Sequence, residues 1–166
     1  MDYFIILEDI LLTKLPKEKF IKFDKFYKLF LENKLIFDHN YRALDLENPS
    51  YNDFLSIVKP TKLPPIKNFK TKEGKKYLIH TILHIEYSAV DLALDAALRY
   101  QNMPLEFYKD WLEVASDEIR HFLMLEKLLN ELNGFYGEFE VHKNLFEAMQ
   151  QTPDLLSRMA CIPRYL

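Results

Sequence analysis

Hydrophobic residues recur at the helical period through most of the chain, and this pattern predicts an all-α protein. Two long amphipathic helices stand out, one from about Lys72 to Gln101 and the next from about Pro104 to Asn133. The connection between them, Asn102-Met103, is short, so the two helices are expected to pack as antiparallel neighbours. The centre of the predicted fold is therefore a long antiparallel helix pair.

Shorter helices are predicted on either side of this pair. Tyr3 to Leu12 forms a short helix, and Pro16 suits the first turn of a second helix that runs to about Glu32. A further helix starts at about Leu145 and continues towards Cys161, with a fresh cap or a break at Thr152-Pro153, before Pro163 interrupts it. The side chains of the second helix expected to face inward are Phe20, Phe23, Phe26, Tyr27 and Phe30.

Residues 35–70 show little helical period, and their prolines favour an extended course wrapped over the helical body. Thr71 is a suitable N-cap for the first long helix, and Gly134 a suitable C-cap for the second. We therefore expect one compact unit. Its N-terminal helices and extended linker occupy residues 1–70, and its main helical part occupies residues 71–166.

Three polar residues interrupt the apolar stripes of the long pair. Glu118 and His121 form a Glu-x-x-His motif, which aims a carboxylate and an imidazole from one helix face at one metal, and Glu86 stands within the apolar face of the preceding helix. Glu86 is sixteen residues before Asn102 and Glu118 sixteen after it, so at about 1.5 Å per residue the two carboxylates should be nearly level. We interpret the three residues as ligands of a buried metal site, the alternative being a polar core cluster without metal.

This set is half of the ligand set of a ferritin-like di-iron or di-manganese bundle. Carboxylate and imidazole ligands without thiolate favour iron or manganese, although zinc can also occupy them. The chemistry then expected is oxygen activation on an unidentified substrate. A non-catalytic helical module for metal binding or interaction is the alternative.

Two other histidines, His80 and His84, lie on the same predicted helix as Glu86. Their spacing of four residues places them on one face, nearly opposite Glu86. The same face carries Asp91 and Asp95. These residues could form a second metal or catalytic patch, but hydrogen bonds to the wrapping segment are the favoured interpretation, because no third ligand is aligned with the histidines. His142 lies in a predicted loop, where it could reach a site or cap a helix.

Composition narrows the functional classes. The chain has 166 residues, 49% of them hydrophobic, only three glycines and a net charge of −3, which is typical of one globular helical domain. No basic stripe indicates nucleic-acid binding, and the lysines of the second helix, Lys19 among them, are interpreted as a solvated face. No segment is apolar enough to span a membrane, and the start lacks the basic region of a secretory signal. With a single cysteine, Cys161, the expected location is cytoplasmic.

The chain also resembles an uncharacterised bacterial family of ferritin-like proteins, domain-of-unknown-function family 455, over roughly residues 58–166. The motifs that carry the resemblance occur in order as His80 to Glu86, Ala89 to Ala96, Phe107 to Trp111, Ala115 to Phe122, Tyr136 to Phe139 and Arg158 to Arg164. The resemblance implies that Glu86, Glu118 and His121 are metal ligands. It also implies a distant likeness to bacterial tRNA hydroxylases, so a tRNA-modifying enzyme is a third functional alternative.

Members of this family continue beyond the length of this chain, and the extension supplies a third-helix glutamate and a second Glu-x-x-His motif. By this resemblance the ferritin-like bundle is incomplete here. We therefore expect either a missing C-terminal segment or a partner chain, and apolar faces left uncovered around Glu86 and Glu118 should favour a homo-oligomer.

Overall fold

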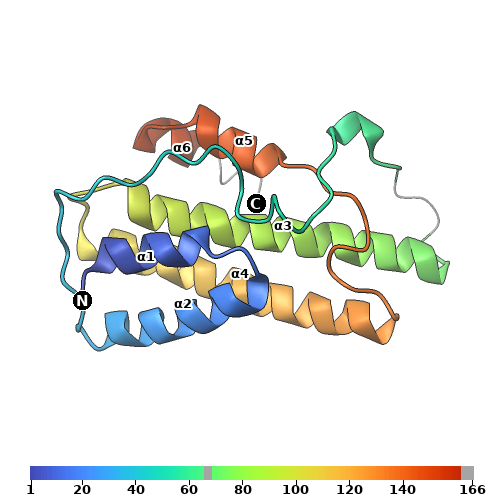
Figure 1. Ribbon diagram of the computed structural model, residues 1–166, viewed down its shortest axis with the longest axis horizontal. Helices are drawn as coiled ribbons and strands as arrows, with labels where there is room; N and C mark the ends of the chain where they lie inside the picture. The colour runs from blue at the N-terminus through green and yellow to red at the C-terminus, as the bar shows by residue number, and fades with distance from the viewer. Residues whose placement is uncertain (66–68, 162–166) are drawn as a thin grey trace.

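The computed structural model describes residues 1–65 and 69–161, and this part of the chain is all-α (Figure 1). Its helices are α1 (Tyr3–Leu12), α2 (Pro16–Leu31), α3 (Lys72–Arg99), α4 (Leu105–Glu131), α5 (Asn144–Gln151) and α6 (Leu155–Cys161), with a short 3₁₀ helix at Pro60–Lys62. The predicted helix boundaries are confirmed to within two residues, including the break between α5 and α6. Pro163 lies outside the described residues.

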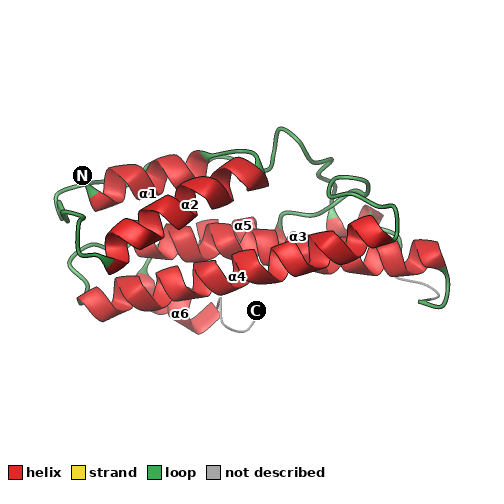
Figure 2. Ribbon diagram, turned by 90° about the horizontal axis from the view of Figure 1, so that it is seen from below, coloured by secondary structure: helices red, strands yellow, loops and turns green. Residues whose placement is uncertain are grey.

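The antiparallel pair α3 and α4 forms the body of the bundle and has the most extensive contacts of any two elements (Figure 1). Helices α1 and α2 lie along one side of this pair, and α5 and α6 lie on another side (Figure 2). The predicted long antiparallel pair is thus confirmed. None of the described helices combines the length and apolar character needed to cross a membrane.

The helix ends follow local sequence signals. The Thr71 hydroxyl accepts a hydrogen bond from the Gly74 backbone N–H at 3.1 Å, as expected for an N-cap. The predicted C-cap of α4 is off by one residue, because Asn133, with φ of 58°, takes the left-handed position that was assigned to Gly134. Gly134 instead donates its N–H to the Leu129 carbonyl at 3.0 Å, where a Cβ would lie only 2.7 Å from the Leu129 side chain.

The described residues between α2 and α3, 32–65 and 69–71, wrap over the bundle, as predicted for residues 35–70 (Figure 1). This segment begins with a bridge in which Ile36 pairs with Asp2, and later Ile57 pairs with Val141 of the loop between α4 and α5. Tyr51 and Leu55 of this segment are buried in the core. The wrap therefore ties the start of the chain to a loop more than a hundred residues away, and the short 3₁₀ helix at Pro60–Lys62 lies within it.

The core is rich in aromatic side chains, which come from both the N-terminal helices and the long pair. Four of the five inward residues predicted for α2 are buried, and Tyr27 is half-buried against the same core. Phe20 of α2 packs edge-on against Phe122 of α4, with ring centroids 5.1 Å apart. One continuous hydrophobic cluster thus holds α1 and α2 against α3 and α4.

Two aspartates on α3 are buried, which was not expected from the sequence. Asp91 forms an ion pair with Lys19 and accepts a hydrogen bond from the Ser50 hydroxyl at 2.6 Å. The Lys19 side chain is fully buried, and its Nζ lies 5.0 Å from the centre of the Tyr87 ring. The prediction that Lys19 belongs to a solvated face is therefore wrong, because α2 turns this lysine inward to neutralise a buried carboxylate.

The second buried aspartate, Asp95, is paired with two arginines. Arg158 Nη1 donates to Asp95 Oδ2 at 2.8 Å, and Arg99 Nη2 donates to Asp95 Oδ1 at 2.7 Å. The remaining nitrogens of Arg158 donate to Thr152 and to the Met149 carbonyl. This network fixes α6 and the end of α5 to α3.

Prediction for the buried ion pair. Removing one partner leaves an uncompensated buried charge, so Lys19→Met should lower the free energy of unfolding by about 3–5 kcal/mol in urea titrations. The double variant Lys19→Met/Asp91→Leu should recover most of this loss. Lys22→Met, which removes an exposed pair with Asp9, is the control, with an expected change below about 1 kcal/mol. Equal effects of the two single lysine variants would contradict the assignment.

Candidate metal centre

Helix α4 presents two adjacent faces to the rest of the molecule. The first is buried against the core and carries Tyr108, Leu112, Ala115, Ile119, Phe122 and Leu129. The second, which we call the site stripe, is mainly half-buried, and its residues follow one another at alternating spacings of three and four. The site stripe consists of Trp111, Val114, Glu118, His121, Leu125 and Leu128, together with Leu132, the C-cap residue of the helix. The residues predicted to form one apolar stripe on this helix are thus divided between two faces. Glu118 and His121 lie on the more exposed face.

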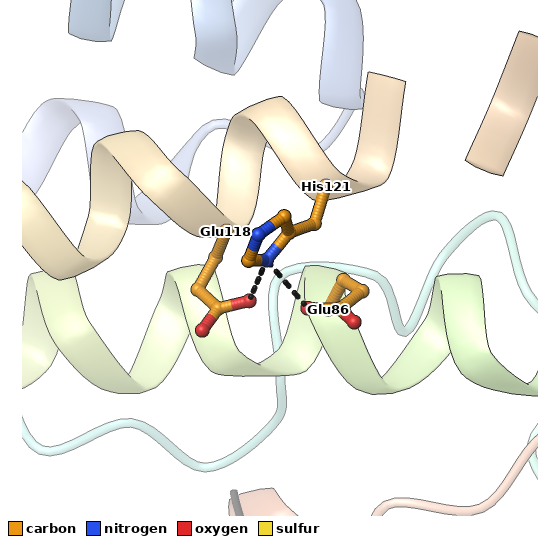
Figure 3. Close-up of side chains that lie close together, drawn as sticks. All are labelled: Glu86, Glu118 and His121. Carbon is orange, nitrogen blue, oxygen red and sulfur yellow. Dashed lines mark hydrogen bonds and ion pairs between the residues drawn. The ribbon is translucent and has the colours of Figure 1, made fainter. Parts of the chain in front are cut away.

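The structure brings Glu86, Glu118 and His121 together between α3 and α4 (Figure 3). One potential ligand atom from each lies within 4.8 Å of the other two. His121 Nδ1 is 3.3 Å from Glu118 Oε2 and 3.6 Å from Glu86 Oε2. The antiparallel packing places Glu86 level with Glu118, and the Glu-x-x-His spacing places the imidazole on the same side of α4.

The cluster is half-buried, whereas the sequence indicated a buried one. The side chains of Glu118, Glu86 and His121 are 16%, 21% and 37% exposed. Every residue of α3 from Leu83 to Leu98 is buried except Ile85 and Glu86, so the cluster lies where the enclosure of this helix is interrupted. The three side chains therefore face an open edge of the helix pair.

The electrostatics of the cluster favour binding of a cation. Burial, together with a hydrogen bond and charge repulsion from Glu118, raises the pKa of Glu86 to about 7, and His121 opposes the shift. Two carboxylates that share one site cannot both ionise without cost. A proton or a metal ion removes this repulsion, and near neutral pH the two compete for the same oxygens.

Arg120 contacts the far side of the imidazole. Its Nη2 lies 3.1 Å from His121 Nε2, and its Nε lies 3.4 Å from Asp117 Oδ1. Because a guanidinium can only donate, Nε2 is the acceptor and Nδ1 carries the proton that faces Glu118. Arg120 is exposed, so the hydrophobic pattern of the helix does not mark it as a neighbour of the site.

The secondary candidates, His80, His84 and His142, lie apart from this cluster. His84 Nδ1 is 2.9 Å from the Tyr136 hydroxyl, and its Nε2 donates to the His142 carbonyl at 2.8 Å. The Gly137 N–H donates to His80 Nε2 at 2.9 Å. The partner of these two histidines is thus the loop between α4 and α5. The hydrogen bond to the wrapping segment that the sequence predicts for this face is made by Asp91, which accepts from Ser50.

His142 lies directly before Lys143, the N-cap residue of α5. Its Nδ1 accepts a hydrogen bond from the Asn144 N–H at the start of α5, at 3.4 Å.

Burial lowers the pKa of His80 and of His84 to about 4, so both rings are neutral at pH 7. Neutral rings whose nitrogens are engaged with a loop act as structural hydrogen-bonding groups.

The fold and the cluster define an all-α bundle protein with a carboxylate–histidine group between two antiparallel helices. The family described as "Protein of unknown function (DUF455)" matches residues 12–166, so the chain belongs to this family. The match extends beyond the region of resemblance noted from the motifs, into the N-terminal helices.

An uncharacterised protein of Haemophilus influenzae (strain ATCC 51907 / DSM 11121 / KW20 / Rd) is 41% identical over 118 residues. The aligned region covers 66% of this chain and 41% of that relative, so the chain spans about two fifths of the relative's length. No solved structure matches the chain.

Prediction for the buried histidines. The unfolded chain binds protons at His80 and His84 below about pH 6.5, whereas the folded chain resists protonation until about pH 4. The free energy of unfolding should therefore fall as the pH drops from 6.5 to 4. In urea titrations across this range, His84→Gln should show a shallower fall, by an amount on the order of 3 kcal/mol. An unchanged slope would contradict the assignment of His84 as a buried neutral ring.

Prediction for Glu86 in the metal-free protein. Its pKa in the folded chain is about 7, above the ordinary value of 4.5, so ionisation destabilises the folded state. The penalty is absent below about pH 4.5, grows up to pH 7 and is complete above it. Glu86→Gln should therefore raise the midpoint of thermal unfolding at pH 8 and leave it nearly unchanged at pH 4. Destabilisation at pH 8 by this variant, in the presence of a chelator, would contradict the prediction.

Proposed function

We propose that this chain is part of a ferritin-like di-metal carboxylate protein that binds iron or manganese through Glu86, Glu118 and His121. The convergence of these three groups on one point carries the proposal. Two carboxylates and one imidazole without a thiolate suit iron and manganese, and zinc is also accommodated by such a set. The arrangement equals one half of the set found in di-metal bundles, where each of two helices gives a Glu and each of two others gives Glu-x-x-His.

The residues of this chain would hold the ion and manage protons. Ionised Glu86 and Glu118 would supply oxygen ligands, and His121 would supply Nδ1 after losing the proton that it directs at Glu118. The other ring nitrogen would then need a proton, so Arg120 must release its contact with Nε2. A bound iron or manganese pair would supply oxygen activation, and we propose an oxidoreductase acting on an unidentified substrate.

A non-catalytic metal-binding or interaction module is a second candidate, favoured by one observation. The cluster is half-exposed, whereas oxygen chemistry generally requires a site from which water is excluded. The third candidate, a tRNA-modifying hydroxylase-like enzyme, would need a surface for RNA, and the net charge of −3 gives it no support.

Prediction for metal binding. Protein expressed with added iron and manganese and purified without chelator should retain metal, measured per chain by elemental mass spectrometry. Glu118→Ala removes a ligand and should weaken metal affinity by at least about tenfold. Glu113→Ala, which removes an exposed carboxylate from the same helix, should retain the wild-type metal content. If Glu118→Ala binds as much metal as the wild type, the site assignment is wrong.

Oxygen uptake separates the first two candidates. The chain loaded with Fe(II) should consume O₂ faster than the same Fe(II) in buffer, and Glu118→Ala should abolish the difference. If the chain binds Fe(II) through these residues but O₂ uptake does not exceed that of the buffer, the non-catalytic module is the correct candidate for this chain.

A further inference from the structure

Both nitrogens of the His121 ring have partners in the folded chain. Nδ1 faces Glu118 and Glu86 (Figure 3), and Nε2 accepts a hydrogen bond from Arg120 Nη2 at 3.1 Å. The same guanidinium contacts Asp117 Oδ1 through its Nε, at 3.4 Å. Arg120 therefore lies between the imidazole of His121 and the carboxylate of Asp117.

This arrangement holds the ring in the tautomer that does not bind metal at the cluster. An ion shared with Glu86 and Glu118 needs the lone pair of His121 Nδ1. While Arg120 donates to Nε2, the single proton of the neutral ring is on Nδ1 and faces Glu118. Metal binding therefore requires that Nδ1 lose its proton and that Nε2 gain one. The ring stays neutral, but Nε2 becomes a donor, and a guanidinium cannot accept from it.

Asp117 is the group in place to accept from Nε2. Residues three and four positions away share the face of His121 on α4, and these residues are Asp117, Glu118, Met124 and Leu125. Glu118 is engaged with the other ring nitrogen, and the side chains of Met124 and Leu125 carry no oxygen. Side chains four residues apart on a helix have Cβ atoms about 5–6 Å from each other. The Asp117 carboxylate is thus the acceptor on this face that Nε2 can reach.

We propose that Arg120 and Asp117 form a switch that controls metal binding by His121. Without metal, Arg120 holds Nε2 and keeps the proton on Nδ1. When an ion binds Nδ1, Arg120 moves away, and Asp117 accepts the hydrogen bond from Nε2–H and orients the ring. This inference rests on the metal-binding function proposed above. Asp117 is a positioning residue in this scheme, because it acts on the ion through His121.

The exchange of partners requires little rearrangement. The side chains of Arg120 and Asp117 are 59% and 66% exposed, so each can change its rotamer in solvent. Exposed ion pairs such as the one between them are weak. A hydrogen bond from a metal-bound imidazole to a carboxylate is charge-assisted, and it is therefore stronger than the contact it replaces. The bound ion thus favours Asp117 over Arg120 as the partner of Nε2.

The first test locates the proton on the ring. Long-range ¹H–¹⁵N NMR spectra of the histidine side chains show which nitrogen is protonated, and His121→Gln assigns the signals. His121 should carry its proton on Nδ1 in the metal-free protein and on Nε2 after addition of Zn(II), a diamagnetic ion that this ligand set accommodates. A metal-free wild-type ring already protonated on Nε2 would overturn the proposal.

Variants separate the role of Arg120 from a general effect of charge. Metal-free Arg120→Ala should increase the fraction of His121 protonated on Nε2, whereas Lys127→Ala, which removes an exposed cation from the same helix, should not. Arg120→Ala should also strengthen Zn(II) binding about fivefold, the equivalent of one ordinary hydrogen bond that no longer competes with the metal. An equal response to the two variants would contradict the role of Arg120.

The role of Asp117 is measured by Zn(II) affinity in competition with a chelator. Asp117→Ala should weaken binding about 10–100-fold, as is usual when the partner of a metal-bound imidazole is removed. Asp117→Asn keeps an acceptor oxygen and should recover part of this loss. Glu113→Ala removes another exposed carboxylate of α4 and should leave the affinity nearly unchanged. Equal losses in Asp117→Ala and Glu113→Ala would reveal a general charge effect and overturn the assignment.

The two proposals fail in different ways. If Zn(II) binds through Glu118 and His121, but Asp117→Ala and Arg120→Ala bind it as the wild type does, the switch is wrong and the metal-binding function stands. If the chain binds neither Zn(II) nor Mn(II), the metal-binding function is wrong, and the switch with it.

Discussion

Helix α3 is enclosed by protein along most of its second half, and the other segments are arranged so that its polar groups have partners. A buried carboxylate without a partner costs several kcal/mol. Asp91 therefore requires Lys19 from α2 and Ser50 from the wrapping segment, and Asp95 requires Arg158 from α6. Each pair joins α3 to a part of the chain distant in sequence, so these polar contacts fix the order in which segments surround the helix.

The candidate metal centre lies at the point where this enclosure is interrupted. Glu86 is one of two residues between Leu83 and Leu98 that are not buried, and it is a carboxylate with no lysine or arginine among its ion-pair partners in the described structure. Its neighbours are a second carboxylate and an imidazole, and burial together with Glu118 raises the pKa of Glu86 to about 7. The two buried aspartates of α3 are thus paired with basic side chains, whereas the half-buried Glu86 lies beside another carboxylate and an imidazole.

Local sequence signals were sufficient to predict the helices and the three candidate ligands. The hydrophobic period is a property of neighbouring turns, and caps such as Thr71 are contacts within a few residues, so both are readable without knowledge of the fold. The level position of Glu86 and Glu118 follows from helix rise and a short connection, which are also local quantities. The one-residue error at Asn133 arose because asparagine can adopt the left-handed conformation that was assigned to the adjacent glycine.

The sequence by itself determined which residues form the long pair and that a carboxylate–histidine group would meet between its helices. Only the tertiary structure decided what surrounds that group. In the folded chain Lys19 and Asp91 are buried, and His80 and His84 hydrogen-bond to the loop between α4 and α5. The site stripe remains partly exposed. Periodicity shows that a helix face is apolar, but which of several such faces is covered depends on contacts between distant segments, and no local signal encodes those contacts.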